Sequence, residues 1–130
     1  MTDLEDILAR LWAQLPGCRV VAVVGMDGLL VERHPVDGQA AELRSAPDAD
    51  ELEHVAADLT SVLTLVGGEL SHQLGGRVDE LIALGEAGGY LARRIDSELF
   101  VFVVVGASAD LGAVRRETAE VCRQLAGAFA

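Results

Sequence analysis

The pattern of hydrophobic and polar positions predicts three helices. Apolar residues recur every three or four positions in three stretches, which is the spacing of an amphipathic helix. The first helix is expected over about 3–15, the second over 50–74, and the third over 111–129 with Asp110 as its N-cap. The apolar stripe of the second helix comprises Leu52, Val55, Ala56, Leu59, Val62, Leu63, Val66, Leu70 and Leu74. We expect this stripe, from Leu59 to Leu70 in particular, to cover a sheet.

Five strands complete the pattern. Residues 19–24 and 99–105 are almost continuously apolar, which is typical of strands that are covered on both faces. Residues 29–32 return from an Asp-Gly turn and form a hairpin with 19–24. The segments 77–84 and 90–95 precede 99–105 in a three-stranded meander. Residues 33–49 form a long loop with room for a short helical turn over 39–44.

The order α-β-β-α-β-β-β-α predicts an α+β fold with a five-stranded antiparallel sheet. The length of 130 residues is that of one domain, which we expect to span 1–130. Because two strands are apolar on both sides, helices must cover both faces of the sheet. The long second helix is expected on one face, and the first and third helices on the other.

The side of the second helix opposite its apolar stripe is unusual. Small residues recur there where an exposed helix face would carry charges. The residues are Ala57, Ser61, Thr64 and Gly68, with Leu65 beside them. This composition predicts a contact surface for a partner protein. The alternative is an exposed surface that is rich in alanine and glycine only because of the codon bias of a GC-rich genome.

The segment 77–84 is the second unusual feature, because it carries apolar residues on both faces although it is an edge strand. Val78, Ile82 and Leu84 are expected on one face, and Leu81 and Ala83 on the other. Such an edge invites pairing with another chain. We therefore predict a homodimer interface that contains Val78, Leu81, Ile82 and Ala83. The alternative is an edge that is covered within one monomer.

The composition excludes several function classes. The net charge is −11, so nucleic acids and anionic membranes are not expected partners. No apolar run is long enough for a membrane-spanning helix, and the acidic beginning of the chain argues against a secretion signal. All ten basic residues are arginines, so no lysine exists for a phosphate-binding loop or a Schiff base. The two cysteines do not form a disulfide framework, which favours a reducing, cytoplasmic location.

Candidate catalytic and metal-binding residues are few. His54 and Asp58 lie one helical turn apart, but a third metal ligand at helical spacing is missing. Cys122 lies on the apolar side of the third helix and is expected to be a small core residue, whereas the role of Cys18 stays open. We therefore expect no enzyme, no cofactor and no metal.

Several segments together resemble the Roadblock/LC7 family, and most of all its bacterial MglB-like members. They are the run from Val20 to Val31 with its Met26-Asp27-Gly28 turn, the long helix at 50–74, the Gly-Gly-Tyr entry at 88–90 and the strand 99–105. The resemblance implies a profilin- or longin-like sandwich that forms a homodimer, with third strands paired and second helices side by side. It also implies a non-catalytic regulator or scaffold that binds a small Ras-like GTPase of the MglA type and can accelerate its GTP hydrolysis.

A small-molecule sensor of PAS or profilin-like shape is the alternative function. Five antiparallel strands with flanking helices can enclose a ligand. A sensor needs a pocket with a few convergent polar groups. The stripes that face the predicted core are almost purely aliphatic, so the regulator is the preferred interpretation.

Overall fold

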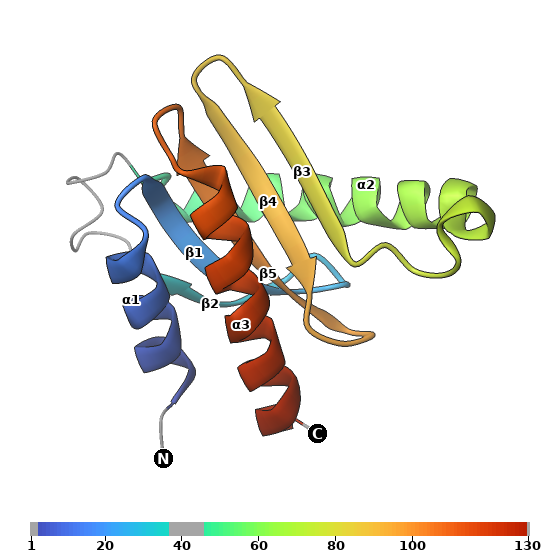
Figure 1. The fold of residues 1–130 in the computed structure, drawn as a ribbon, viewed down its shortest axis with the longest axis horizontal. Coiled ribbons are helices and arrows are strands. Elements are labelled where there is room, and N and C mark those ends of the chain that lie inside the picture. Colours follow the sequence, from blue (N-terminus) through green and yellow to red (C-terminus); the bar gives the residue numbers. More distant parts are fainter. Residues whose placement is uncertain (1–2, 37–45, 130) are drawn as a thin grey trace.

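The computed structural model describes residues 3–36 and 46–129, and it contains the predicted elements in the predicted order (Figure 1). The elements are α1 (Leu4–Gln14), β1 (Cys18–Gly25), β2 (Leu30–His34), α2 (Ala49–Leu74), β3 (Glu80–Gly85), β4 (Gly88–Arg94), β5 (Leu99–Gly106) and α3 (Leu111–Phe129). None of the helices in these two ranges is long and apolar enough to cross a membrane.

The five strands form one antiparallel sheet in the order β2-β1-β5-β4-β3. The two most apolar strands, β1 and β5, lie at or next to the centre and pair with each other from Cys18 to Gly25. Their side chains are buried on both faces, as the continuous apolar runs predict. The sheet ends at β2 on one side and at β3 on the other.

Helices cover both faces of the sheet, as predicted. Figure 1 shows α1 and α3 on one face and α2 crossing the strands on the other. Under α1 and α3, a core forms around residues such as Leu8, Val103 and Leu125. Under α2, a second core contains Leu52 and the stacked rings of Tyr90 and Phe102. The sheet therefore separates two apolar layers, and this arrangement gives the α+β sandwich.

Helix α2 has 26 residues and is longer than the sheet is wide. A helix of this length spans about 39 Å, whereas four strand spacings span about 19 Å. The part of the helix up to Leu63 therefore lies on the sheet and buries Leu59 and Leu63. The rest of α2 runs past β3 (Figure 1), which leaves Leu70 39% and Leu74 56% exposed. The prediction that the stripe covers the sheet as far as Leu70 was wrong for this physical reason.

Strand β3 begins at Glu80 and not at residue 77. Leu81 points into the core under α2 and Ile82 toward the core under α1 and α3, as expected. Val78 precedes the strand, and its side chain is buried in the core under α2. The expectation that Val78 shares a face with Ile82 was wrong, because the alternation of faces holds only within the strand.

The segment after β2 is connected to the sheet through Arg33. This buried side chain donates from Nε to the Pro35 carbonyl oxygen at 2.8 Å and from Nη2 to the Pro47 carbonyl oxygen at 2.9 Å. Both ends of the long loop are thereby fixed beside β2. The predicted helical turn over 39–44 lies outside the described residues.

Candidate functional site

The turn between β1 and β2 packs against the middle of α2. Gly28 has φ +86°, a conformation that favours glycine, and a Cβ atom there would lie 3.6 Å from the Cα atom of Ala57. Asp27 stabilises the turn, because its Oδ1 atom accepts a hydrogen bond from the Leu29 amide at 3.0 Å. The Asp-Gly turn that the sequence predicts therefore lies directly beside the small residues of α2.

A shallow hollow of about 540 Å³ lies where this turn and α2 meet. It is lined by Met26, Asp27, Gly28, Ala57, Thr60, Ser61, Thr64 and Leu65. Asp27 is the one ionisable side chain among these lining residues. The floor of the hollow is low because the side chains of alanine, serine and threonine project little from the helix. A protein partner can therefore approach the backbone of α2 closely here.

The hydroxyl groups of the hollow are satisfied within the helix itself. Thr60 Oγ1 donates to the carbonyl oxygen of Ala56 at 2.7 Å, and Thr64 Oγ1 donates to that of Thr60 at 2.9 Å. Ser61 Oγ makes the equivalent bond to Ala57 at 3.2 Å. Because these hydroxyls bond to the preceding turn, covering them would leave no polar atom without a partner. The side chains of this surface are therefore small, and removing water from them costs little free energy.

Four of the five predicted partner-binding residues line this hollow. Ala57, Ser61, Thr64 and Leu65 are all exposed on the outer side of α2. Gly68 is exposed as well, but it lies one turn beyond the hollow. Met26, Asp27 and Gly28 also line the hollow, and the sequence did not predict their contribution. The Asp-Gly motif indicates a turn, but no local signal shows which helix that turn packs against.

The predicted dimer residues lie around the free edge of β3. Leu81 and Ile82 are half-buried and Ala83 is exposed, whereas Val78 is already covered by the monomer. The Arg94 amide donates to the Asp79 carbonyl oxygen at 2.8 Å. Hydrogen-bonded and non-bonded pairs alternate in an antiparallel ladder. With the observed β3–β4 register, Leu81 and Ala83 bond to β4, while the amides of Ile82 and Leu84 point outward.

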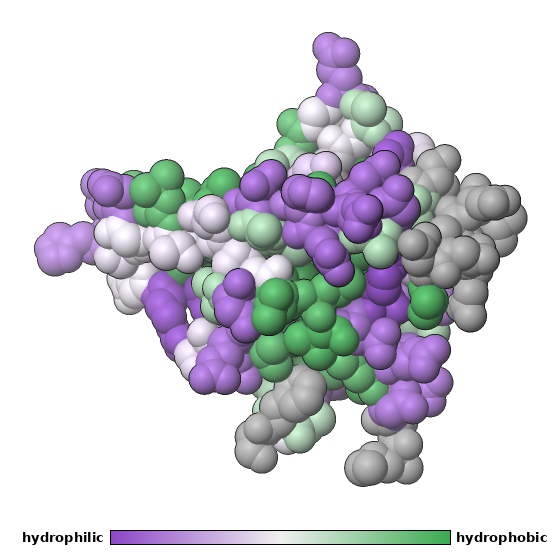
Figure 2. All heavy atoms as spheres, turned by 180° about the vertical axis from the view of Figure 1, so that it is seen from behind, coloured by the Kyte–Doolittle hydropathy of each residue, from purple (hydrophilic) through white to green (hydrophobic). Residues whose placement is uncertain are grey.

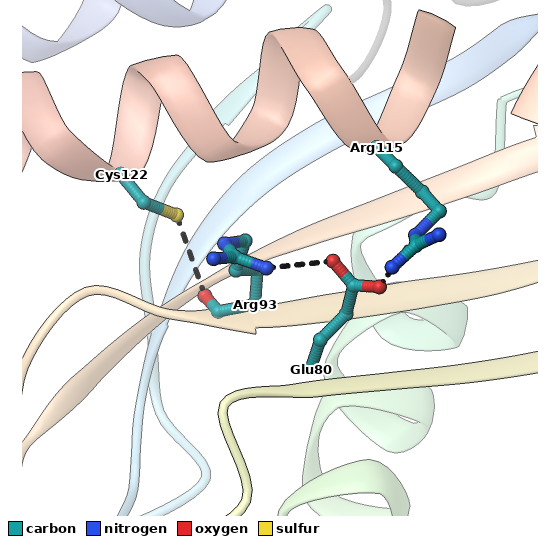
Figure 3. Close-up of polar contacts among 4 residues, drawn as sticks. All are labelled: Glu80, Arg93, Arg115 and Cys122. Atoms are coloured by element: carbon teal, nitrogen blue, oxygen red, sulfur yellow. Dashed lines mark hydrogen bonds and ion pairs between the residues drawn. The ribbon is translucent and has the colours of Figure 1, made fainter. Parts of the chain in front are cut away.

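Ion pairs hold the first residue of β3 in place. Glu80 contacts Arg93 of β4 at 2.8 Å and Arg115 of α3 at 2.7 Å, as Figure 3 shows. Cys122 of α3 lies close by, and its Sγ atom is 3.6 Å from the Arg93 carbonyl oxygen. The edge strand is therefore connected to the helix layer at its beginning, and its outer edge is presented in a fixed orientation.

Both cysteines are buried in the core. Burial raises the pKa of Cys122 to about 12, so its reactive thiolate is disfavoured at neutral pH. Cys18 is fully buried in the same core, which answers the question that the sequence leaves open. His54 Nδ1 lies 2.7 Å from the Asp50 carbonyl oxygen. Within 3–36 and 46–129, no group of three His, Cys, Asp or Glu side chains could hold a metal ion.

Comparison with solved structures shows that the chain has the Roadblock/LC7 fold. It is similar to a Roadblock/LC7 domain from Streptomyces avermitilis, with TM-score 0.80, 18% sequence identity and coverage of 98% of each chain. An MglB in a tetrameric arrangement gives TM-score 0.79 and 18% identity over 97% of this chain and 90% of that chain. Myxococcus xanthus MglB gives TM-score 0.75 and 19% identity over 98% of each chain. No protein-family model and no curated protein sequence matches the chain.

Proposed function

We propose that this protein is a non-catalytic, homodimeric regulator or scaffold in the cytoplasm that binds a small Ras-like GTPase. It either tethers the GTPase or accelerates its GTP hydrolysis. The proposal combines the Roadblock/LC7 fold, the resemblance to MglB-like proteins, and two surfaces that the monomer leaves uncovered. The single observation that carries it is the low-charge hollow on the outer side of α2, where four residues chosen from the sequence alone lie together.

The second half of α2 and the free edge of β3 support the homodimer. Leu70 and Leu74 face the same side as the residues that cover the sheet, but no strand lies beneath them in the described part of the chain. The outward amides of β3 are next to this uncovered side. A second copy that adds its own β3 and α2 would satisfy the amides and cover the leucines together. One symmetric contact thus accounts for both features.

The hollow supports the partner surface. Two exposed acidic residues of α2, Glu53 and Asp58, lie one turn before Ala57 and directly after it in the sequence. Carboxylates around an apolar surface accelerate the association of a partner that carries basic residues. Two copies of the hollow in a dimer would offer one broad surface, which suits a folded protein better than a small ligand.

Affinity purification tests this proposal. The purified protein serves as bait in an extract of its native cell, and we expect a Ras-like protein in the eluate. A Ser61→Arg bait should lose that protein, because a long charged side chain fills the hollow. A Ser108→Arg bait is the matched control, because Ser108 is an exposed serine in the loop after β5. Equal recovery by both variant baits would contradict the proposed surface.

A nucleotide titration separates a regulator from a nucleotide-binding protein. The chain has no phosphate loop and no lysine, so it should bind neither ATP nor GTP on its own. Isothermal titration calorimetry checks this expectation. Submillimolar binding of either nucleotide would overturn the assignment of a purely regulatory role.

A further inference from the structure

A second uncovered apolar surface lies at the opposite end of the sheet from the proposed dimer edge. Leu29 is 66% exposed and Val31 is 53% exposed, although large aliphatic side chains are usually covered. Val31 belongs to β2, which is the last strand on its side of the sheet, and Leu29 directly precedes this strand. Figure 2, seen from the α2 side, shows hydrophobic residues gathered below the helix with hydrophilic residues around them. Neither the proposed dimer nor the proposed GTPase surface uses these residues.

A hollow of about 660 Å³ accompanies the exposed pair. It is lined by Gly25, Met26, Asp27, Leu29, Leu30, Val31, Ser97, Glu98 and Leu99. Two segments supply these residues: one runs from the end of β1 through the turn into β2, and the other runs from the turn after β4 into β5. This volume is in the range of pockets that bind drug-sized ligands, so several side chains of a peptide can fit.

The charged residues that line the hollow indicate which kind of molecule binds there. Both charged residues that line it, Asp27 and Glu98, are carboxylates. A second copy of this chain, with its net charge of −11, is a poor match for such a rim, whereas a segment with basic residues is a good one. The aliphatic floor requires aliphatic side chains in the same segment.

Part of the backbone edge of β2 is already hydrogen-bonded to a side chain. This limits how a peptide segment with basic residues can bind there. The Arg33 amide donates to Glu32 Oε1 of its own strand at 3.1 Å. The strand also changes register next to Val31, and such a bulge interrupts a regular edge. Addition of a further strand along β2 would have to displace the Glu32 carboxylate. Insertion of aliphatic side chains into the hollow requires no such change.

We propose that this hollow is a docking site for a short peptide segment of another protein, with aliphatic side chains in the hollow and flanking lysine or arginine residues against Asp27 and Glu98. Met26 and Asp27 line both this hollow and the hollow on α2, so the two sites meet at the β1–β2 turn. Leu29, Val31 and Glu98 line only this hollow, and Ser61 lines only the hollow on α2. A dimeric scaffold with this site could hold a second protein while its α2 surface is engaged.

A synthetic peptide tests the site directly. The probe is a short, fluorescently labelled peptide with a central leucine pair flanked by lysine and arginine, and its binding is followed by anisotropy. We expect saturable binding that weakens with salt, and NMR shift changes confined to residues near 25–31 and 97–99. A probe with glutamate in place of the basic residues should bind at least about tenfold more weakly.

Variants of the protein assign the binding to this hollow. Leu29→Ser should lower the affinity for the basic probe at least about tenfold, and Glu98→Arg should lower this affinity as well. Leu84→Ser is the matched control, since Leu84 is 60% exposed on the opposite edge of the sheet. No saturable binding, or equal effects of Leu29→Ser and Leu84→Ser, would overturn the proposal. So would a fall in molar mass caused by Leu29→Ser in sedimentation, because the surface would then be a contact between copies. Ser61→Arg should leave probe binding unchanged, so failure here and failure of the GTPase proposal are distinguishable.

Discussion

Glu80 of β3 and Arg115 of α3 are 35 positions apart in the sequence, and their side chains form an ion pair with 2.7 Å between Oε1 and Nε (Figure 3). The other carboxylate oxygen of Glu80 binds Arg93 of β4 at 2.8 Å. The Glu80 side chain is only 12% exposed, so little water competes for it. One carboxylate thus connects the edge strand, its neighbour and the helix above them.

Removal of this carboxylate should loosen β3. We expect Glu80→Ala to lower the free energy of unfolding by about 1–2 kcal/mol, because two guanidinium groups lose a shielded partner. Glu120→Ala is the control, because Glu120 pairs with Arg123 on the exposed side of α3 and should contribute only about 0–0.5 kcal/mol. Urea denaturation of both variants measures the difference. Equal losses of unfolding free energy in the two variants would contradict the proposal that Glu80 stabilises β3.

The direction of the backbone amides in β3 predicts how proline affects the dimer. The Ile82 amide points outward, so Ile82→Pro removes a donor that is available to a second copy. Ile82→Ala removes the same side chain but keeps the amide. We expect sedimentation equilibrium to show a weaker dimer for Ile82→Pro than for Ile82→Ala. The same dimer affinity for both variants would exclude strand pairing at this edge.

Proline one residue earlier should act differently. The Leu81 amide bonds to β4, so Leu81→Pro breaks the ladder within the monomer. We expect this variant to lose about 3 kcal/mol or more of stability, with any loss of dimer as a consequence. Thermal unfolding distinguishes the two prolines, since Ile82→Pro should retain the more stable monomer. The opposite order of stabilities would show that the inferred amide directions are wrong.

The glycines of α2 provide a test of close helix contact. A Cβ atom at Gly68 would meet no atom within 4 Å, so Gly68→Ala should stabilise the monomer by about 0.5–1 kcal/mol. Gly127→Ala in α3 is the control, with equally open space around its Cβ position. If a second helix approaches Gly68, this variant should also weaken the dimer, and Gly127→Ala should not. Unchanged dimerisation in both variants would assign Gly68 to the ordinary surface.

The buried thiol of Cys122 predicts slow alkylation and a pH-dependent contribution to stability. Because burial raises its pKa to about 12, the folded protein holds the thiol proton more tightly than the unfolded chain, whose pKa is near 9.0. Its contribution to stability is therefore complete below pH 9 and is lost as the pH rises toward 12. We expect iodoacetamide to modify Cys122 at pH 8 at least about a hundredfold more slowly in the folded protein than in urea. Peptide mass spectrometry measures this ratio, and similar rates would contradict the burial.

The fold was predictable because its strongest signals are local. The continuous apolar runs of β1 and β5, the Asp-Gly turn and the long amphipathic pattern of α2 each specify an element without reference to the others. The order of elements then limits the sheet to few topologies. Both helix layers followed from the need to cover β1 and β5 on two faces. All of these expectations agree with the structure.

The errors concern relationships between elements. Periodicity predicts which side of α2 is apolar, but not that the sheet ends at β3 before the helix does, so the exposure of Leu70 and Leu74 was not predicted. Alternation predicts faces only inside a strand, so Val78 was assigned to the wrong side. The packing of Gly28 on Ala57 joins two distant segments. Contacts of this kind depend on tertiary structure, and a single sequence carries no local signal for them.

The most direct test of the proposed function is a calorimetric titration of the purified protein with a small Ras-like GTPase from the same cell, loaded with a non-hydrolysable GTP analogue. We expect the native protein and the Ser108→Arg variant to bind with the same affinity. Ser61→Arg should bind more weakly by about 1–3 kcal/mol, or roughly 5- to 150-fold, with an unchanged melting temperature because Ser61 is exposed. Loss of affinity in Ser61→Arg alone would support the account. Absence of GTPase binding by the native protein, or identical affinities for all three, would contradict it.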